Sequence, residues 1–282
     1  MAVVTDSTAS LDPAVAAHAG VAVIPLRVVV DEISRSESEV EPAEVARALR
    51  AGRRVSTSRP SPERIAATYA ALVANGATAI VSVHLSAKIS GTYAAALVAA
   101  ESAAVPVRVV DSATLAMATG FAALSAAEAA RAGADVDRVA EAARRRAQDS
   151  TTYFSVDTLE YLRRGGRIGT AAAMFGSALA VKPILTIAAG EIRAHERVRT
   201  QSKARARLAE LGLAALAREA GHRPHVDVAV HHLDDLDGAR QLVDRLSGRV
   251  SSGGELVVSE VSAVLGGHVG PGVLGVVVSP RS

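Results

Sequence analysis

Short apolar runs alternate with helical patterns through the first 150 residues, and this order constrains the fold more than any other feature. The runs at 3–4, 21–30, 78–83 and 107–110 predict strands. Helical patterns separate or follow them, after Asp12-Pro13, over 42–51, after Ser61-Pro62, after Ser90, and over 114–131 and 136–147. Strands that alternate with helices in this way indicate a parallel sheet covered by helices.

The pattern changes after residue 150. The stretch TYFSVDTLEYLRRGGRIG predicts a short strand, a one-turn helix and a glycine-rich turn. Further candidate strands lie at 181–188, 191–195, 226–230, 256–258 and 274–278. Candidate helices lie at 201–217 and 235–246. A chain of 282 residues is long for a single core. We therefore expect an α/β fold of two domains, with a parallel sheet in residues 1–150 and a mixed sheet in residues 151–282.

Composition excludes several classes of function. The chain has no cysteine, so disulfides, thiolate metal sites and a thioester on the protein are excluded. A formal net charge of +2 and only four Tyr and three Phe, with no Trp, argue against nucleic acid as a partner. We find neither a signal-peptide pattern nor an apolar run of membrane-spanning length. A cytoplasmic location is expected, with no integral membrane contact but with room for transient contact with a membrane surface.

Hydroxyl side chains recur at the predicted ends of elements. They occur in Thr5-Asp6-Ser7-Thr8, Ser56-Thr57-Ser58, the turn 86–92 and Asp111-Ser112. Loops at the carboxyl ends of parallel strands converge, so Ser7, Thr57, Ser90 and Ser112 are expected at one site. Hydroxyls and free N–H groups at helix N-termini suit an anion. For any one of these residues alone, a helix N-cap is the favoured interpretation, but four at the same kind of position favour a shared site.

The motifs for common anion chemistry give no support for a nucleotide site. The sequence has no G-x-x-x-x-G-K-[ST], and the glycine-rich stretch 165–169 lacks the G-x-G-x-x-G spacing, so no ATP site is predicted. It has no G-x-S-x-G around a serine and no H-E-x-x-H. His231-His232 beside Asp234-Asp235 is interpreted as a strand end rather than a metal site, and 144–146 as a solvated helix face. No cofactor, metal or catalytic residue is predicted.

Eight motifs in order resemble one family. They are VTDSTASL, TSRPSP, HLSAKISGTYAAA, VVDSATLAMATG, YLRRGGRIG, KPIL, VRT and GGHVGPG. Together they are similar to the DegV family of bacterial fatty-acid-binding proteins that serve fatty acid kinase. The resemblance spans nearly the whole chain. The sequence departs from the family's pattern at Ala87-Lys88-Ile89.

The resemblance implies a ligand, a site and a partner. A fatty acid would lie in a tunnel between the two domains, with its carboxylate held by Thr57 and Ser90 and by the adjoining Ser58, Gly91 and Thr92. His268 matches the histidine beside that head group. Arg167 and Arg199 match arginines linked to the acyl phosphate or the kinase, while Ser7, Asp111 and Ser112 form an additional polar turn. A separate ATP-binding subunit would phosphorylate the bound acid for phospholipid synthesis, so the chain itself would be a carrier rather than an enzyme.

The physical chemistry of such a ligand agrees with the composition. A buried carboxylate needs hydrogen-bond donors, whereas an acyl tail needs a channel of aliphatic side chains. About fourteen methylenes at ~0.8 kcal/mol each contribute on the order of 11 kcal/mol before ordering costs, against about 1.5–3 kcal/mol for a charge-assisted hydrogen bond.

Alternatives stay open at this stage for the residues and for the function. His268 can occupy a tight surface turn, Arg167 can cap a short helix, and Arg199 can be a solvated charge in a basic stretch. The chain can be a fatty-acid carrier, a stand-alone acyl hydrolase or transferase using Ser90 with His268, or a lipid-responsive regulator.

Overall fold

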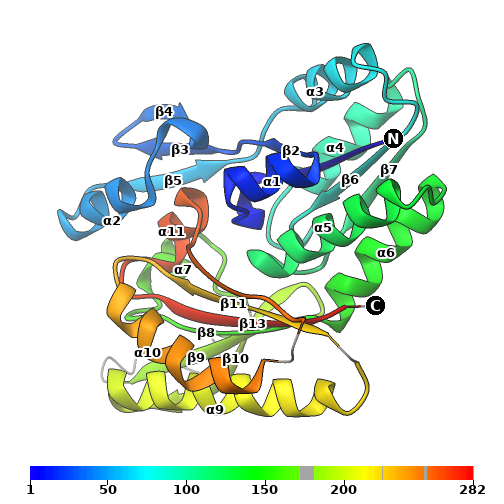
Figure 1. The fold of residues 1–282 in the computed structure, drawn as a ribbon. Coiled ribbons are helices and arrows are strands. Elements are labelled where there is room, and N and C mark those ends of the chain that lie inside the picture. Colours follow the sequence, from blue (N-terminus) through cyan, green and yellow to red (C-terminus); the bar gives the residue numbers. More distant parts are fainter. Residues whose placement is uncertain (170, 172–180, 224, 251–252, 282) are drawn as a thin grey trace.

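The chain builds three β-sheets in a computed structural model that describes residues 1–169, 171, 181–223, 225–250 and 253–281. Sheets A and B come from the first half of the chain and form the upper part of Figure 1, and sheet C comes from the second half and lies below them. The predicted α/β class is confirmed. The predicted boundary near residue 150 falls just before the first strand of sheet C, and the division into two domains remains a prediction.

Sheet A is parallel, as the alternation of strands and helices predicts. Its strands are, in spatial order, β2 (Val21–Ile24), β1 (Ala2–Asp6), β6 (Ile80–His84) and β7 (Val107–Asp111). One face packs against α3 (Pro62–Ala74) and α4 (Thr92–Glu101), and the other against α1 (Pro13–Ala19), α5 (Met117–Arg131) and α6 (Val136–Asp149). Asp12 and Ser61 cap α1 and α3, each followed by proline in the first helical turn, as expected.

Sheet B is a small antiparallel sheet that the sequence analysis missed. Its strands are β4 (Ile33–Ser36), β3 (Arg27–Val30) and β5 (Val55–Ser58), joined through the 3₁₀ turn η2 (Glu37–Glu39) and α2 (Pro42–Arg50). The prediction of a single strand over 21–30 is therefore wrong, because two strands in different sheets share this range. The chain leaves sheet A at Pro25, which has no N–H to donate to a neighbouring strand. Residues 56–58 are likewise part of a strand and not a turn.

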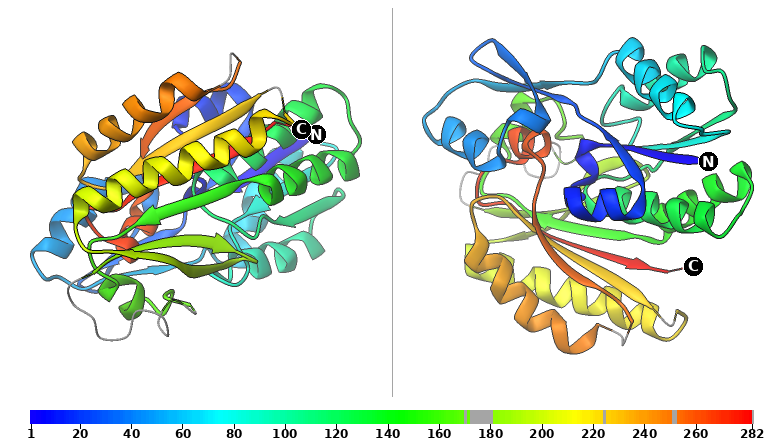
Figure 2. Two further views of the ribbon diagram at one scale, coloured as in Figure 1. Left: turned by 90° about the horizontal axis from the view of Figure 1, so that it is seen from below. Right: turned by 45° about the horizontal axis from the view of Figure 1, so that its top comes forward.

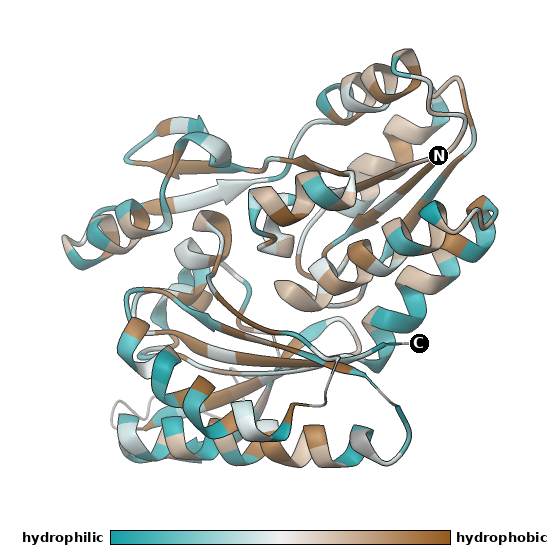
Figure 3. Ribbon diagram, viewed as in Figure 1, coloured by the Kyte–Doolittle hydropathy of each residue, from teal (hydrophilic) through white to brown (hydrophobic). Residues whose placement is uncertain are grey.

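Sheet C has mixed topology, as predicted. Its order is β10 (Glu191–Val198), β9 (Lys182–Ala188), β8 (Thr151–Ser155), β13 (Leu274–Pro280), β11 (Val226–His232) and β12 (Leu256–Glu260). Only the β11–β12 pair is parallel. The long helix α9 (Gln201–Ala220) and α10 (Leu236–Leu246), which the 3₁₀ turn η3 (Ser247–Arg249) follows, cover its outer face side by side (Figure 2). Hydrophilic and hydrophobic residues alternate along both helices, while the central strands of the sheet are largely hydrophobic (Figure 3).

The two halves of the chain are joined through shared cores and a buried ion pair. The short helices α7 (Glu160–Arg164) and α11 (Ala263–Val269) lie between sheet C and sheet B, and α11 packs directly on sheet B and α2. On α6, Arg146 is 2% exposed and pairs with Asp227 of β11, so the expectation of a solvated face at 144–146 is wrong for this residue. Helical periodicity places Arg146 beside the inward-facing Val139 and Ala143.

No helix within the described ranges is both long enough and apolar enough to cross a membrane.

Candidate functional site

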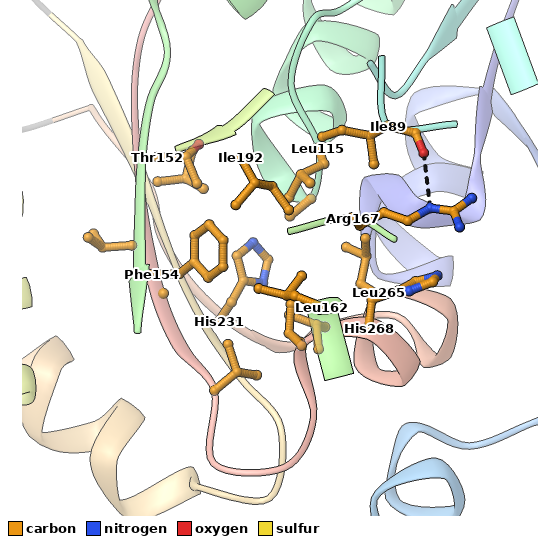
Figure 4. A pocket seen from close by; sticks show the side chains of 17 residues that line it. Ile89, Leu115, Thr152, Phe154, Leu162, Arg167, Ile192, His231, Leu265 and His268 are labelled. Atoms are coloured by element: carbon orange, nitrogen blue, oxygen red, sulfur yellow. Dashed lines mark hydrogen bonds between the residues drawn. The ribbon is translucent and has the colours of Figure 1, made fainter. Parts of the chain in front are cut away.

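An apolar pocket lies between the inner face of sheet C and the segments that follow β6 and β7 (Figure 4). Most of its lining is aliphatic or aromatic, and its free volume is about 50 Å³. The residues that line it are Ile89, Leu115, Ala116, Thr152, Phe154, Leu162, Arg167, Ile192, His231, Val261, Leu265, His268, Val269, Val273, Gly275, Val276 and Val277. Both halves of the chain therefore contribute to one apolar compartment.

One end of this pocket is polar. Arg167 and His268 point to the same end, away from Phe154 and His231 (Figure 4). Arg167 Nε donates to the backbone carbonyl of Ile89 at 3.3 Å, and its Nη1 donates to the carbonyl of Gly165. Arg167 thus connects the glycine-rich turn after α7 to the turn that carries Ser90. Its bond to Gly165 is also a helix-end contact, so the capping interpretation of Arg167 holds beside any functional one.

His268 lies in the last turn of α11, so the interpretation as a tight surface turn is wrong. Its Nε2 is 2.7 Å from Thr57 Oγ1 on β5, which brings together two residues that are 211 positions apart in the chain. The ring packs against Gly165, where a built Cβ atom would lie 2.2 Å from His268 Nδ1. Only glycine at position 165 leaves room for the imidazole in this place.

The charge state and tautomer of His268 follow from its surroundings. Burial, with the positive charge of Arg167 adding to it, lowers the pKa of His268 to about 4, so the ring is neutral at pH 7. Its Nδ1 is buried and has no hydrogen-bond partner among the residues that the structure describes. A bare lone pair on Nδ1 near a guanidinium is favourable, whereas an N–H there would lack an acceptor. We therefore assign the proton to Nε2, which donates to Thr57 and leaves the Thr57 hydroxyl proton free.

Ser90 lies next to this end of the pocket, directly after Ile89. Its hydroxyl is 2.9 Å from Thr92 Oγ1 and accepts from the Thr92 N–H at 3.3 Å. The N-cap residue of α4 is Gly91, so the N-cap interpretation of Ser90 is wrong by one residue, although its hydroxyl still contacts the first turn of the helix. Ser90 and Gly91 are half-buried and Thr92 is buried. The turn itself is fixed from two sides. Ser86 Oγ donates to the carbonyl of Gly190 at the β9–β10 hairpin at 2.6 Å, and Asp111 Oδ1 accepts from the Ala87 N–H at 3.1 Å.

The other predicted site residues lie in different surroundings. The Ser7 hydroxyl accepts from the Leu26 N–H at 2.9 Å, and the buried Ser112 hydroxyl is 3.0 Å from Thr119 Oγ1, so both hold the local fold. Ser58 is exposed and follows Thr57 on β5, where side chains alternate between faces, so it is not brought to His268. Arg199 is exposed just after β10 and has no ion-pair partner among the residues that the structure describes.

The sequence of this chain matches known proteins along its length. The family model described as "Uncharacterised protein, DegV family" matches residues 1–281. The chain belongs to the DegV family. A DegV domain-containing protein of Streptomyces coelicolor is 54% identical over 282 residues, which cover 100% of this chain and 99% of that protein. One from Deinococcus radiodurans is 34% identical over 284 residues, covering 100% and 99%.

Solved DegV structures share the fold. A DegV family protein from Thermus thermophilus, described as binding fatty acid, has a TM-score of 0.90 and 33% identity, covering 99% of each chain. DegV from Bacillus subtilis, described as a fatty acid binding protein, has a TM-score of 0.88 and 32% identity, again covering 99% of each chain.

Two features of this DegV chain escaped the sequence analysis. His231 lines the pocket wall, where its Nε2 accepts from the Met117 N–H at 3.2 Å and its Nδ1 is 3.0 Å from Ser259 Oγ. Its place in the apolar strand VDVAVHH is the signal that could have found it. Arg59 lies across Gly91, beside the Ser90 turn. Its signal was its position two residues after Thr57 in TSRPSP.

A buried serine, histidine and aspartate also occur together in this DegV chain, away from the pocket. His84 Nδ1 is 2.9 Å from Asp6 Oδ2, and its Nε2 is 2.8 Å from Ser82 Oγ. All three side chains have no exposed surface, so no substrate reaches them. They join β1 to β6 inside sheet A and have a structural role.

Proposed function

We propose that this DegV protein binds a long-chain fatty acid, with the tail in the apolar pocket and the carboxylate at the polar end beside Thr57, Ser90 and His268. The observation that carries the proposal is that the pocket is apolar along its length and ends at Arg167 and His268. The description of the Thermus and Bacillus neighbours as fatty-acid binding supports the same ligand class.

The tail supplies most of the affinity in this proposal. About fourteen methylenes at ~0.8 kcal/mol each outweigh any single head-group bond. The pocket lining is mostly aliphatic and aromatic, so the methylenes pack against apolar side chains.

The head group meets donors that are already oriented. Because His268 donates to Thr57, the Thr57 hydroxyl donates its own proton to the carboxylate. Ser90 supplies a second hydroxyl, and the positive charge of Arg167 offsets the negative charge of the ligand. Neutral His268 leaves the carboxylate ionised and accessible from the exposed side of the site.

We further propose that the chain acts as a carrier for a separate ATP-dependent kinase subunit in the cytoplasm. A carboxylate oxygen attacks the γ-phosphorus of ATP, the bond from that phosphorus to the β,γ-bridging oxygen breaks, and ADP leaves. The acyl phosphate then supplies phospholipid synthesis. Two observations support this division of work: the sequence lacks an ATP motif, and Arg199 is exposed with no ion-pair partner in the described part of the chain.

The stand-alone hydrolase has less support. A serine nucleophile needs a base within hydrogen-bond reach and a third group that orients the base. Here His268 bonds Thr57 rather than Ser90, and its Nδ1 has no partner among the described residues.

The test compares Thr57→Val, Thr57→Ser and Ser90→Ala in titrations with hexadecanoate. Thr57→Val and Ser90→Ala each remove one donor, so each is expected to weaken binding by about tenfold or less. Thr57→Ser keeps the hydroxyl and is expected to bind like the parent. If Thr57→Val and Ser90→Ala both bind hexadecanoate as tightly as the parent, the carboxylate lies elsewhere.

A further inference from the structure

Arg59 crosses the turn that carries Ser90. A Cβ atom built on Gly91 would lie 2.9 Å from Arg59 Nη1 and 3.0 Å from Arg59 Cδ, so the side chain packs on the bare glycine backbone. Arg59 directly follows β5, which carries Thr57, and Pro60 and Pro62 follow it before α3. Two prolines restrict the backbone of this connection, so the guanidinium is presented from a stiff segment.

The guanidinium charge of Arg59 is available to a ligand. The side chain is exposed, and it has neither an ion-pair nor a hydrogen-bond partner in the part of the chain that the structure describes. Arg167 differs, because two of its nitrogens donate to the carbonyls of Ile89 and Gly165. The two arginines thus approach the Ser90 turn differently. Arg167 lines the pocket with its donors partly used, and Arg59 lies on the exposed surface with all its donors available.

We propose that Arg59 binds the phosphoryl group of the acyl phosphate. This inference rests on the proposed function and adds to it a residue that distinguishes product from substrate. Phosphorylation extends the head group outward by one phosphorus and raises its charge from about −1 to about −2, so the added group lies toward the solvent side of Ser90. A guanidinium with free donors in a planar fork matches phosphate oxygens. Arg59 therefore favours the phosphorylated ligand over the free acid.

Two variants disturb this contact in different ways. Arg59→Ala removes the guanidinium. Gly91→Ala keeps it but places a methyl group where it packs, and the flexible side chain is displaced without strain in the backbone. Arg64→Ala, which removes an exposed arginine from the first turn of α3, is the matched surface-charge control.

The experiment measures binding of hexadecanoate and of 2-oxoheptadecylphosphonate at low and high salt. The second probe is a stable analogue of hexadecanoyl phosphate in which a methylene group replaces the bridging oxygen, and the assay pH is alkaline enough for its phosphonate to be a dianion. Arg59→Ala is expected to weaken binding of 2-oxoheptadecylphosphonate about tenfold at low salt and binding of hexadecanoate no more than about twofold. Gly91→Ala is expected to weaken binding of 2-oxoheptadecylphosphonate to a similar extent. The double variant should lose no more than Arg59→Ala alone, because both changes remove one contact. Arg64→Ala should bind both probes like the parent.

Equal losses for the two probes in Arg59→Ala, no loss of 2-oxoheptadecylphosphonate binding in that variant, or additive losses in the double variant would overturn the role of Arg59. If the parent protein binds hexadecanoate but Arg59→Ala shows no selective loss of phosphonate binding, the fatty-acid proposal stands and only the role of Arg59 is excluded. A parent protein that binds neither probe removes both.

Discussion

At the scale of single residues, burial keeps two histidines of the pocket neutral. Desolvation lowers the pKa of both His231 and His268 to about 4. The Met117 N–H donates to His231 Nε2, so Nδ1 carries the proton and donates to Ser259. His231 thus links sheet C to the first residue of α5, and its protonation breaks that link.

The pH dependence of stability follows from this shift. The unfolded chain takes up the His231 proton near pH 6.5, whereas the folded chain resists it down to about pH 4. Stability from this group is therefore complete above pH 6.5 and is lost as the pH falls toward 4. In His231→Gln, the drop in unfolding free energy between pH 7 and 4.5 should shrink by about 2 kcal/mol. Urea denaturation at the two pH values checks this, and an unchanged drop would contradict it.

The sequence indicated which residues belong to the site but not how they contact one another. Thr57, His268, Arg167 and Ser90 were all singled out from motifs, and the structure places them around one end of the pocket. The 2.7 Å contact between Thr57 and His268 could not be predicted, because it depends on how α11 packs against sheet B. Ser7 and Ser112 were grouped with the site because they are polar and follow strands, but local bonds use their hydroxyls.

At the scale of elements, the connection between α6 and β11 depends on one carboxylate. Asp227 accepts from Arg146 of α6 and, at 2.8 and 2.9 Å, from Arg281. Arg146 Nε also donates to Ser279 of β13 at 2.6 Å, and its guanidinium carbon lies 5.3 Å from the centre of the Phe121 ring. A buried arginine in this position is stable only while its charge is paired.

Replacing Asp227 and replacing Arg146 should therefore lower the unfolding free energy by different amounts. Asp227→Asn leaves Arg146 buried without a counter-charge, and we expect a loss of about 3–5 kcal/mol in unfolding free energy. Arg146→Met leaves Asp227 paired with Arg281, so its loss should be smaller. Chemical denaturation of both variants measures the two losses. The account is wrong if Arg146→Met is the more destabilised.

Elements with a strong hydrophobic period were predictable, and short polar ones were not. The strands β1, β6 and β7 of sheet A and the helices α3, α9 and α10 lie close to their predicted positions. The strands ISRS and VSTS of sheet B were missed because they are polar and four residues long. Arg146 was assigned to solvent by its charge, and only the fold shows the aspartate that makes its burial possible.

At the scale of the whole molecule, the pocket exists only where the two halves of the chain meet. Its polar end combines β5, the turn before α4, the turn after α7 and the end of α11, which come from four separate regions of the sequence. Arg199 lies beyond the end of β10, outside the pocket lining. In the proposed function, ligand retention and transfer to the kinase therefore depend on different residues.

Charge reversal at Arg199 tests this separation. Arg199→Glu should retain its fatty acid but slow kinase-dependent acyl phosphate formation, most clearly at low salt, since rim charges act mainly on association rate. Arg249→Glu is the control, because Arg249 is also exposed but follows α10. Arg205 is unsuitable as a control because it pairs with Asp235 at 2.8 Å. Loss of lipid, or the parent's rate at every salt concentration, would contradict the role of Arg199.

The most direct measurement of the central claim is the identity of the lipid that the protein retains. The purified protein is denatured, extracted with organic solvent and examined by mass spectrometry, with delipidated protein then titrated with hexadecanoate. The account predicts a long-chain free fatty acid at about one per chain, and rebinding after its removal. A protein that carries no fatty acid and does not bind added hexadecanoate would contradict it.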